Sequence, residues 1–476
     1  MNRDEVGGIK MIRFETAVGK GGISGIGRRT FLRSAGAAAV LHFPDAASAV
    51  QPGTGLRVCT FRCDATPPLA ETLAWDIKLT KIIDPLLLKG VVLEDNGKRY
   101  VLCALDWCLL CNESERSFRE TLARAAGTEP ACVAIHCVHQ HAAPYADEDA
   151  HRLLDKAPAT PHLTEGFLDG LRTRMGKAVI DAVGRLEPVD RVGCGTARVD
   201  RVASQRRIMG RDGKIITRVS EGARNPEMAK LPEGYIDPML KTITFARGEK
   251  VLARLHYYAT HPQTHSCDGS VSADFVGMAR ESLEQEEGVF QIYFNGCGGN
   301  VTVGKYNNGT LQAREELASR LKAGIRAAVA ATRFAPAGRL VWRTEALVLP
   351  IRTDDGFVQQ LRANLAATQP GTRVYKGAMR LATVARAKRP FGFSSLQIGK
   401  IRIVHLPGEP MLEFQTFAQS CRPNDFVAVA GYGDCAPAYL CTDQAFTEGG
   451  YEPSNSILAP GAEAVLKGAI QRLLGV

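Results

Sequence analysis

Six of the ten histidines in this chain lie in two short clusters that are far apart in the sequence. Histidine is the commonest metal ligand in proteins and the usual proton carrier near neutral pH. Two separated clusters are typical of one site assembled by the fold, so the first hypothesis is an enzyme with a metal centre. The clusters comprise His136, His139 and His141, and then His256, His261 and His265.

The first cluster contains the pair His139-x-His141. Side chains two residues apart on a strand point to the same face, so a strand end here would present both imidazoles to one pocket. Pro144 then ends the predicted strand. His136 is out of phase with the pair and is assigned to the framework. Hydrogen-bonded core histidines are the alternative interpretation of the pair itself.

The second cluster begins in a predicted strand over 252–258. His261 comes just after this strand, where loops fixed by a rigid sheet commonly carry ligands in α/β enzymes. His265 could share a metal with His261 only on a helix, which Pro262 disfavours. We therefore keep His261 as a candidate ligand and assign His256 and His265 to the framework.

Two histidines do not complete a zinc site, because a catalytic zinc has about three protein ligands and one open position. Glu409 is a candidate third donor, since it follows an apolar strand in a sharp Pro-Gly turn, residues 406–410. On the residues alone, a solvated loop carboxylate is the simpler interpretation of Glu409.

The segments that must position these residues alternate between strand-like and helix-like patterns. Strands are predicted over 99–105, 132–138, 191–199, 240–246, 250–258, 289–294, 339–352 and 426–431, and a strand or hairpin over 396–406. Helices are predicted over 113–126, with Asn112 or Ser114 as the cap, and over 164–186, 275–286, 311–331, 354–385 and 462–474. No repeat or Gly/Ser/Pro linker divides residues 50–476. The sequence thus predicts an α/β protein with a mixed, largely buried β-sheet core flanked by helices, in a single large catalytic domain.

Residues 1–49 read as a targeting segment. A twin-arginine pattern, residues 27–33, precedes a small apolar run, residues 34–41, and the cleavage signal Ala47-Ser48-Ala49. This order predicts a bacterial Tat signal peptide, the Tat translocase as a partner during export, and a periplasmic or extracellular protein. A cytosolic protein with a chance arginine pair is the alternative.

Charge and composition exclude other classes. Residues 1–49 hold seven of the 59 basic and four of the 50 acidic residues, which leaves a net charge of +6 on the remainder. This mild charge, without a basic run or an aromatic-rich groove, gives no support for nucleic acid binding. The chain contains no stretch of about twenty apolar residues, so no transmembrane span is predicted.

The cysteine count is odd, at thirteen, so at least one cysteine has no partner within the monomer. Cys59 with Cys63 and Cys108 with Cys111 could form disulfides, zinc pairs or redox pairs. Packing as small apolar residues is the favoured interpretation, because most of the cysteines have apolar neighbours.

Six motifs in order resemble the catalytic domain of the neutral/alkaline (non-lysosomal) ceramidases across nearly the whole of residues 50–476. The family has H-T-H-S-x-P, A-x-H, S-G-D-x-x-G, G-D-V-S-P, P-G-E-F, and Y-x-x-Y-x-T-T ahead of a Y-E pair. The corresponding segments here are 139–144 (HQHAAP), 259–261 (ATH), 272–277 (SADFVG), 299–303 (GNVTV), 407–410 (PGEP), and 439–442 (YLCT) with 451–452 (YE).

The resemblance implies a role for each matched position. A catalytic Zn²⁺ would be held by His139, His261, Glu409 and Tyr439. His141 would be the acid/base, and Arg206 would orient the substrate carbonyl, with Arg207 as the alternative. Thr302 replaces the family's active-site serine and Asn300 the preceding aspartate, which gives Thr302 a catalytic and Asn300 a substrate-binding position. Asp106 and Asp274 match acidic positions interpreted as structural supports.

The departures concern the parts that would face a lipid. Besides Thr302 and Asn300, Ala436 stands at the first tyrosine of Y-x-x-Y, and no counterpart of the family's C-terminal immunoglobulin-like domain is expected. The leading hypothesis is therefore a zinc-dependent amidohydrolase acting on an N-acyl, small-molecule or lipid-like substrate. A zinc enzyme acting on an ester or a sugar derivative and a non-catalytic exported binding protein are the alternatives.

Overall fold

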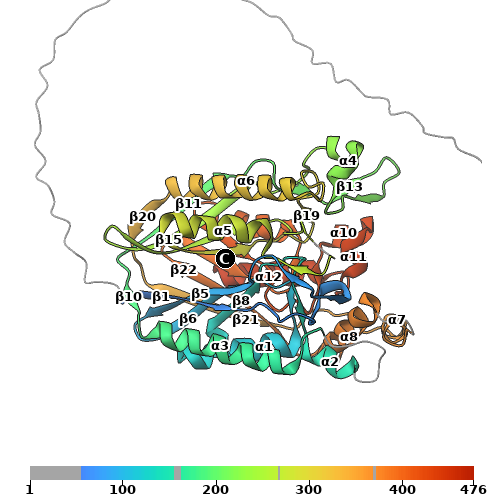
Figure 1. The fold of residues 1–476 in the computed structure, drawn as a ribbon, viewed down its shortest axis with the longest axis horizontal. Coiled ribbons are helices and arrows are strands. Elements are labelled where there is room, and N and C mark those ends of the chain that lie inside the picture. The colour runs from blue at the N-terminus through green and yellow to red at the C-terminus, as the bar shows by residue number, and fades with distance from the viewer. Residues whose placement is uncertain (1–54, 155–161, 266–267, 368–370) are drawn as a thin grey trace, which may run out of the picture. The chain divides into compact units, whose positions relative to one another are not determined.

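Two five-stranded sheets stack between two layers of helices (Figure 1). The computed structural model describes residues 55–154, 162–265, 268–367 and 371–476, within a compact unit formed by residues 51–476. The predicted signal peptide, residues 1–49, lies outside the described residues. The first sheet has the order β10 (Glu187–Pro188), β1 (Arg57–Asp64), β5 (Leu87–Asp95), β6 (Lys98–Leu105), β8 (Val133–Cys137). The second has the order β18 (Phe290–Asn295), β16 (Lys250–Tyr258), β15 (Met239–Arg247), β11 (Arg191–Arg198), β20 (Arg333–Pro336).

Helices cover the outer face of each sheet. On the first sheet lie α1 (Asn112–Ala126) and α3 (Glu165–Val183), and on the second lie α5 (Asp274–Glu287) and α6 (Leu311–Ala330) (Figure 1). A four-stranded sheet adds β21 (Leu340–Leu347), β22 (Phe391–Ile398), β23 (Ile401–His405) and β25 (Phe426–Ala430). The remaining helices are α2 (Glu148–Leu154), α4 (Pro226–Lys230), α7 (Asp355–Leu365), α8 (Thr372–Ala385), α9 (Leu412–Cys421), α10 (Asp443–Glu448), α11 (Tyr451–Asn455) and α12 (Ala462–Leu474).

The first sheet is buried on both faces. Alternate side chains of β6 point in opposite directions. Val101 and Cys103 pack against the α1 and α3 side, whereas Leu102 and Ala104 pack between the two sheets. The predicted fold class, a mixed and largely buried sheet core flanked by helices in a single domain, is confirmed.

Several predicted boundaries were wrong. The strand predicted over 339–352 ends at Leu347. The segment predicted over 396–406 as a strand or hairpin is a hairpin, and it begins earlier, at Phe391. The helix predicted over 354–385 is two helices, α7 and α8. Strands β1 and β5 went unpredicted. In β5 the apolar run is broken by Lys89 and Gly90, and Lys89 is buried because it pairs with Glu281 and Glu284 of α5 at 2.8 and 2.7 Å.

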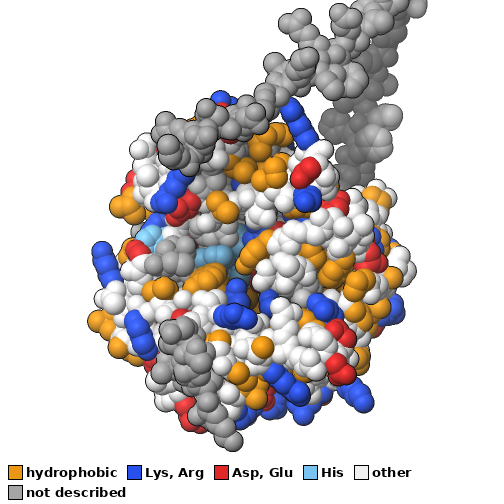
Figure 2. Space-filling model, turned by 90° about the vertical axis from the view of Figure 1, so that its right-hand side faces the viewer, with side chains coloured by type: hydrophobic (Ala, Val, Ile, Leu, Met, Phe, Trp, Pro, Cys, Tyr) orange, Lys and Arg blue, Asp and Glu red, His pale blue; other side chains and the backbone are white. Residues whose placement is uncertain are grey.

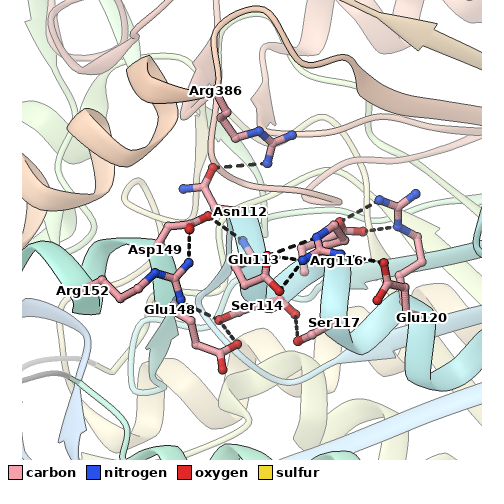
Figure 3. A network of polar contacts seen from close by, with 12 residues as sticks. Asn112, Glu113, Ser114, Arg116, Ser117, Glu120, Glu148, Asp149, Arg152 and Arg386 are labelled. Atoms are coloured by element: carbon pink, nitrogen blue, oxygen red, sulfur yellow. Dashed lines mark hydrogen bonds and ion pairs between the residues drawn. The ribbon is translucent and has the colours of Figure 1, made fainter.

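Helix α1 begins without the predicted side-chain cap. Its N-cap residue is Cys111, whose own side chain makes no capping hydrogen bond. The backbone N–H groups of Asn112 and Glu113 donate to the carboxylates of Asp434 at 3.1 Å and Asp149 at 3.2 Å, respectively. The Asn112 side-chain amide donates to Asp147 at 2.7 Å. The Ser114 hydroxyl donates to Glu148 at 3.0 Å (Figure 3). These contacts tie the start of α1 to the segment around α2, while Arg386 reaches Asn112 from the end of α8.

Neither candidate cysteine pair forms a disulfide, and the twelve cysteines in the described ranges are free. Cys59 and Cys63 lie on β1, where four residues span about 13 Å, well beyond the reach of a disulfide. Most of the twelve are buried, as the packing interpretation predicts. No described helix has both the length and the apolar character needed to cross a membrane.

Candidate metal centre

The candidate site lies where parallel strands from three sheets end. Strand β8 runs parallel to β6, β16 to β18, and β23 to β25. His139 follows β8, His261 follows β16, and Glu409 follows β23. Ligands in α/β proteins bind outside the carboxyl ends of such strands. Donor atoms of these three buried residues lie within 4.8 Å of one another, so the fold brings the two histidine clusters and Glu409 together.

His139 reaches the site from a loop rather than from a strand, which corrects the geometry predicted for the His139-x-His141 pair. Strand β8 ends at Cys137, and His139 has a left-handed backbone with φ of 72°. Its Nδ1–H donates to the carbonyl of Cys108 at 2.8 Å, because a carbonyl can only accept. Nε2 therefore carries the free lone pair, and it faces Glu409 Oε2 at 3.2 Å.

His261 is held in the same way by the glycine-rich turn after β18. Its Nδ1–H lies 2.7 Å from the carbonyl of Gly298 and 2.9 Å from that of Val301. This contact fixes the tautomer, so Nε2 again carries the lone pair, and it lies 3.6 Å from Glu409 Oε2. Outer hydrogen bonds of this kind orient metal-binding histidines. Burial lowers the pKa of His261 to about 4, and Arg206 adds to the effect.

Glu409 and Tyr439 are brought together by backbone pairing. They are partners in a two-stranded parallel ladder formed by β24 (Glu409–Pro410) and β26 (Tyr439–Leu440). Glu409 Oε2 is buried without a hydrogen-bond partner among the described residues.

These donors fit a zinc ion. In a tetrahedral zinc site with bonds of about 2.1 Å, neighbouring ligand atoms lie about 3.3–3.5 Å apart. Glu409 Oε2 lies at 3.2 and 3.6 Å from the two histidine nitrogens. The set therefore combines two oriented imidazoles with a carboxylate oxygen that no other group satisfies, and the Tyr439 side chain is buried beside them.

Arg206 adjoins two of the proposed ligands. It donates through Nη2 to the Tyr439 hydroxyl at 3.0 Å, and Nη1 lies 3.4 Å from His261 Nε2. Glu452 fixes the guanidinium by accepting from Nε at 2.7 Å, and the Gly299 carbonyl accepts as well. Arg207, the alternative in the sequence, pairs with Glu452 and Glu448 and does not line the pocket beside His141.

His141 lies on the open side of the cluster. Its ring is half-buried, 5.2 Å from that of His139 and 4.5 Å from the indole of Trp75. Burial, followed by the neighbouring His139 and His261, holds the pKa of His141 well below its ordinary value. The imidazole is therefore neutral and can accept a proton.

Asn300 and Thr302 lie beneath the site and do not line its pocket. The Asn300 amide donates to Glu413 at 3.0 Å, and its oxygen accepts from the backbone of Leu412 at 2.8 Å. The Thr302 hydroxyl accepts from Gln263 at 2.9 Å and from the Gly304 backbone at 3.1 Å.

The remaining acids and histidines have structural partners. Asp106 accepts two hydrogen bonds of 2.8 Å from Arg280, and Asp274 accepts from Thr264. His136, His256 and His265 bond to a backbone carbonyl, to Thr242 and Gln291, and to Ser270, respectively.

A pocket of about 90 Å³ opens from the cluster to the surface. Figure 2 shows histidine side chains in a hollow on this face, bordered by hydrophobic and basic side chains. Sequence reasoning missed several of the lining residues, namely Trp75, Tyr145, Lys376 and Arg380, and it gave no role to Tyr451 of the 451–452 motif. A larger cavity, of about 200 Å³, lies around His136 and His405 and contains none of the predicted site residues.

Comparison with solved structures identifies the class of fold as ceramidase-like. The crystal structure of neutral ceramidase from Pseudomonas aeruginosa matches with a TM-score of 0.65 and 15% sequence identity, over 88% of this chain and 74% of that chain. A structure described as ceramidase complexed with C2 matches with the same score and identity, over 88% and 75%. No family model and no curated protein matches the chain. At this identity the likeness shows the fold.

Proposed function

We propose that this protein is a zinc-dependent hydrolase that cleaves the amide bond of an N-acyl substrate. The observation that carries the proposal is the cluster of His139, His261 and Glu409. Both imidazoles turn Nε2 toward one buried carboxylate oxygen that has no hydrogen-bond partner among the described residues, and Arg206 Nη1 approaches His261 Nε2 at 3.4 Å. The fold is consistent with this proposal, because its structural neighbours are named as ceramidases.

His139, His261, Glu409 and Tyr439 would hold the metal. Bound zinc would lower the pKa of water and polarise a carbonyl oxygen. The protein contributes fixed orientation, since backbone carbonyls hold both imidazoles and the β24–β26 ladder holds Glu409 beside Tyr439.

Two further side chains are proposed to act on the substrate. His141 lines the pocket with a neutral ring and would take a proton from the attacking water and pass it to the departing amine. Arg206, which also lines the pocket, would bind the carbonyl oxygen and stabilise the charge that develops on it. Thr302 and Asn300 would act as positioning residues, because their polar groups bond to the framework under the site.

Metal analysis of purified protein tests the site. We expect about one zinc per chain, lost in His139→Ala and in Glu409→Ala and retained in His256→Gln, the matched control for a buried histidine outside the cluster. Turnover of a fluorogenic N-acyl substrate should disappear with a chelator and return with zinc. Full zinc occupancy in both ligand variants would overturn the proposal.

The role of His141 needs a separate readout. His141→Ala should keep its zinc and lose turnover. Unchanged turnover in this variant would remove the acid/base assignment while leaving the metal site intact.

We also propose export by the Tat pathway, on the strength of residues 27–33 and 47–49. Immunoblots of fractionated cells should show the processed protein outside the cytoplasm. A strain that lacks the translocase should retain the precursor inside, and export in that strain would refute the assignment.

A further inference from the structure

We infer that the substrate of this site carries an anionic group close to the scissile bond, and that Lys376 and Arg380 bind this group. The inference rests on the proposed function, because it concerns the pocket that opens from the metal centre. Both side chains line this pocket together with His141 and Glu409. An uncharged lipid such as ceramide offers them no anionic partner, so the inference distinguishes this protein from its structural neighbours.

The two cations lie one helical turn apart on α8 and are half-buried. Like charges four residues apart destabilise a helix, and burial adds a further cost for each charge. Burial lowers the pKa of Lys376, with a further contribution from Arg380, and burial also lowers the pKa of Arg380. A bound anion would offset both costs.

The described residues supply no such anion. Arg380 donates only to the neutral oxygens of Asn455, at 3.0 and 3.3 Å, and no carboxylate there lies within 4.0 Å of Lys376 Nζ or the Arg380 guanidinium. The nearby carboxylates are engaged elsewhere, since Asp76 accepts from His162 at 2.7 Å and Glu409 faces the two histidines.

Arg206, the third cation of the pocket, differs from Lys376 and Arg380 because it is paired with a carboxylate. Its guanidinium is neutralised by Glu452 at 2.7 Å, and a second carboxylate, Glu409, belongs to the metal site. Lys376 and Arg380 are therefore the cations of the pocket whose charge has no direct counterpart in the described part of the chain.

The helix that carries them is fixed beside the site. Tyr375, next to Lys376, stacks on His162 with ring centroids 3.5 Å apart and an angle of 11° between the rings. His162 in turn bonds to Asp76, which adjoins Trp75 at the pocket wall. Trp75 has a left-handed backbone with φ of 62°, and its indole packs on the His141 ring. The proposed acid/base and the helix bearing the two cations are thus joined through one packed set of side chains.

Matched substrates test the inference. N-octanoylglycine and N-octanoylglycinamide have nearly the same shape and differ in one negative charge, and N-octanoyl-aminomethylphosphonate replaces the carboxylate by a phosphonate. A hydrogen bond to a charged group contributes about 1.5–3 kcal/mol, so we expect kcat/KM for the preferred anion to exceed that of the glycinamide at least about tenfold. The two anions distinguish a carboxylate from a phosphate-like group.

The variant Lys376→Gln/Arg380→Gln should bring this ratio toward one, mainly through KM. Arg373→Gln is the control, because Arg373 lies on the same helix, is exposed and bonds to Asn364. It should leave the ratio unchanged. If the double variant fails to fold, Lys376→Met keeps the aliphatic packing and should lower the ratio in the same direction. Equal kcat/KM for anionic and neutral substrates in the wild type would overturn the inference.

Calorimetric binding of the same compounds separates this inference from the proposed function. If none is hydrolysed but the anions bind more tightly and the double variant loses this preference, the inference stands and amide hydrolysis fails. Equal binding of N-octanoylglycinamide and both anions would overturn the inference even if all are hydrolysed.

Discussion

Replacing Glu452 with glutamine should misplace Arg206 without changing any proposed metal ligand. Glu452 is fully buried, and its two oxygens accept from Arg206 Nε at 2.7 Å and from Arg207 Nη1 at 2.9 Å. Burial raises the pKa of this carboxyl, but the two guanidinium groups outweigh burial and the pKa is lowered. At neutral pH a single buried negative charge therefore serves two buried positive charges.

The cost of the change follows from the partners that remain. Removing one member of a buried ion pair costs about 3–5 kcal/mol. Arg207 keeps Glu448 at 3.0 Å, and Arg206 keeps Tyr439 and the Gly299 carbonyl, so we expect a loss near 3 kcal/mol. Unfolding of roughly 420 residues carries an entropy of about 0.9 kcal/mol/K, so this loss lowers the melting temperature by about 3 °C. Losing one oriented donor to the substrate oxygen lowers kcat/KM by about 100-fold.

The assay combines calorimetric melting, turnover of an N-acyl substrate, and zinc content. Glu448→Gln is the matched control, because Glu448 pairs with Arg207 and not with Arg206, and it is half-buried. The control should melt within about 1 °C of wild type and turn over normally. Both variants should keep their zinc. If Glu452→Gln behaved like Glu448→Gln in melting and turnover, the assigned role of Glu452 in holding Arg206 would be refuted.

Three further substitutions test other parts of the argument. Gly299→Ala would place a Cβ 2.7 Å from the Glu409 carbonyl oxygen, so we expect it to destabilise the fold by about 1–3 kcal/mol and to weaken zinc binding. The control Gly166→Ala, whose Cβ would meet no atom within 4 Å, should do neither. Normal metal binding in Gly299→Ala would contradict the close packing. Burial lowers the pKa of His256 to about 4, so the contribution of this histidine to stability is present above pH 6.5 and is lost as the pH falls toward 4. In denaturant titrations at pH 7 and pH 4, His256→Gln should lessen this loss of unfolding free energy by about 3 kcal/mol. An equal loss in wild type and variant would refute the prediction. Burial raises the pKa of Asp147 to about 7, so ionisation of this carboxyl destabilises the native state as the pH rises from about 4 through 7. The melting temperature of Asp147→Asn should therefore rise relative to that of wild type between pH 5 and pH 8. A difference in melting temperature that stays constant over this range would show that the carboxyl titrates normally.

The fold was predictable wherever apolar periodicity decided the structure. Strands β15 and β16 and helix α6 lie within a residue or two of their predicted ranges, because continuous apolar or amphipathic patterns mark them. Strand β5 was not predicted, because Lys89 and Gly90 interrupt its apolar pattern. Lys89 is compatible with burial only because α5 supplies two carboxylates, and Phe61 fills the space beside Gly90, so both reasons lie in other elements.

The site was predictable in its residue types and less so in its geometry. Residue type and position after a strand selected His139 and His261, and the fold does bring them together. The strand geometry assumed for His139 was wrong, since a left-handed residue after β8 directs its ring. The sequence did not predict Lys376 and Arg380 as a pair of site residues, because basic residues on a helix usually face solvent. Only the packing of the helix shows that these two line a pocket.

The pairing of β24 with β26 explains why no local pattern could disclose the whole donor set. Glu409 and Tyr439 are neighbours because the backbone N–H of Glu409 donates to the carbonyl of Ala438 at 2.8 Å and that of Met411 to Leu440 at 3.0 Å. This ladder contains two residues on each side, too short to produce a periodic signal. It forms because β23 and β25, which precede its two strands, run parallel in one sheet and deliver both segments to the same edge. The position of Glu409 relative to Tyr439 therefore follows from sheet topology and from the backbone hydrogen bonds of this ladder.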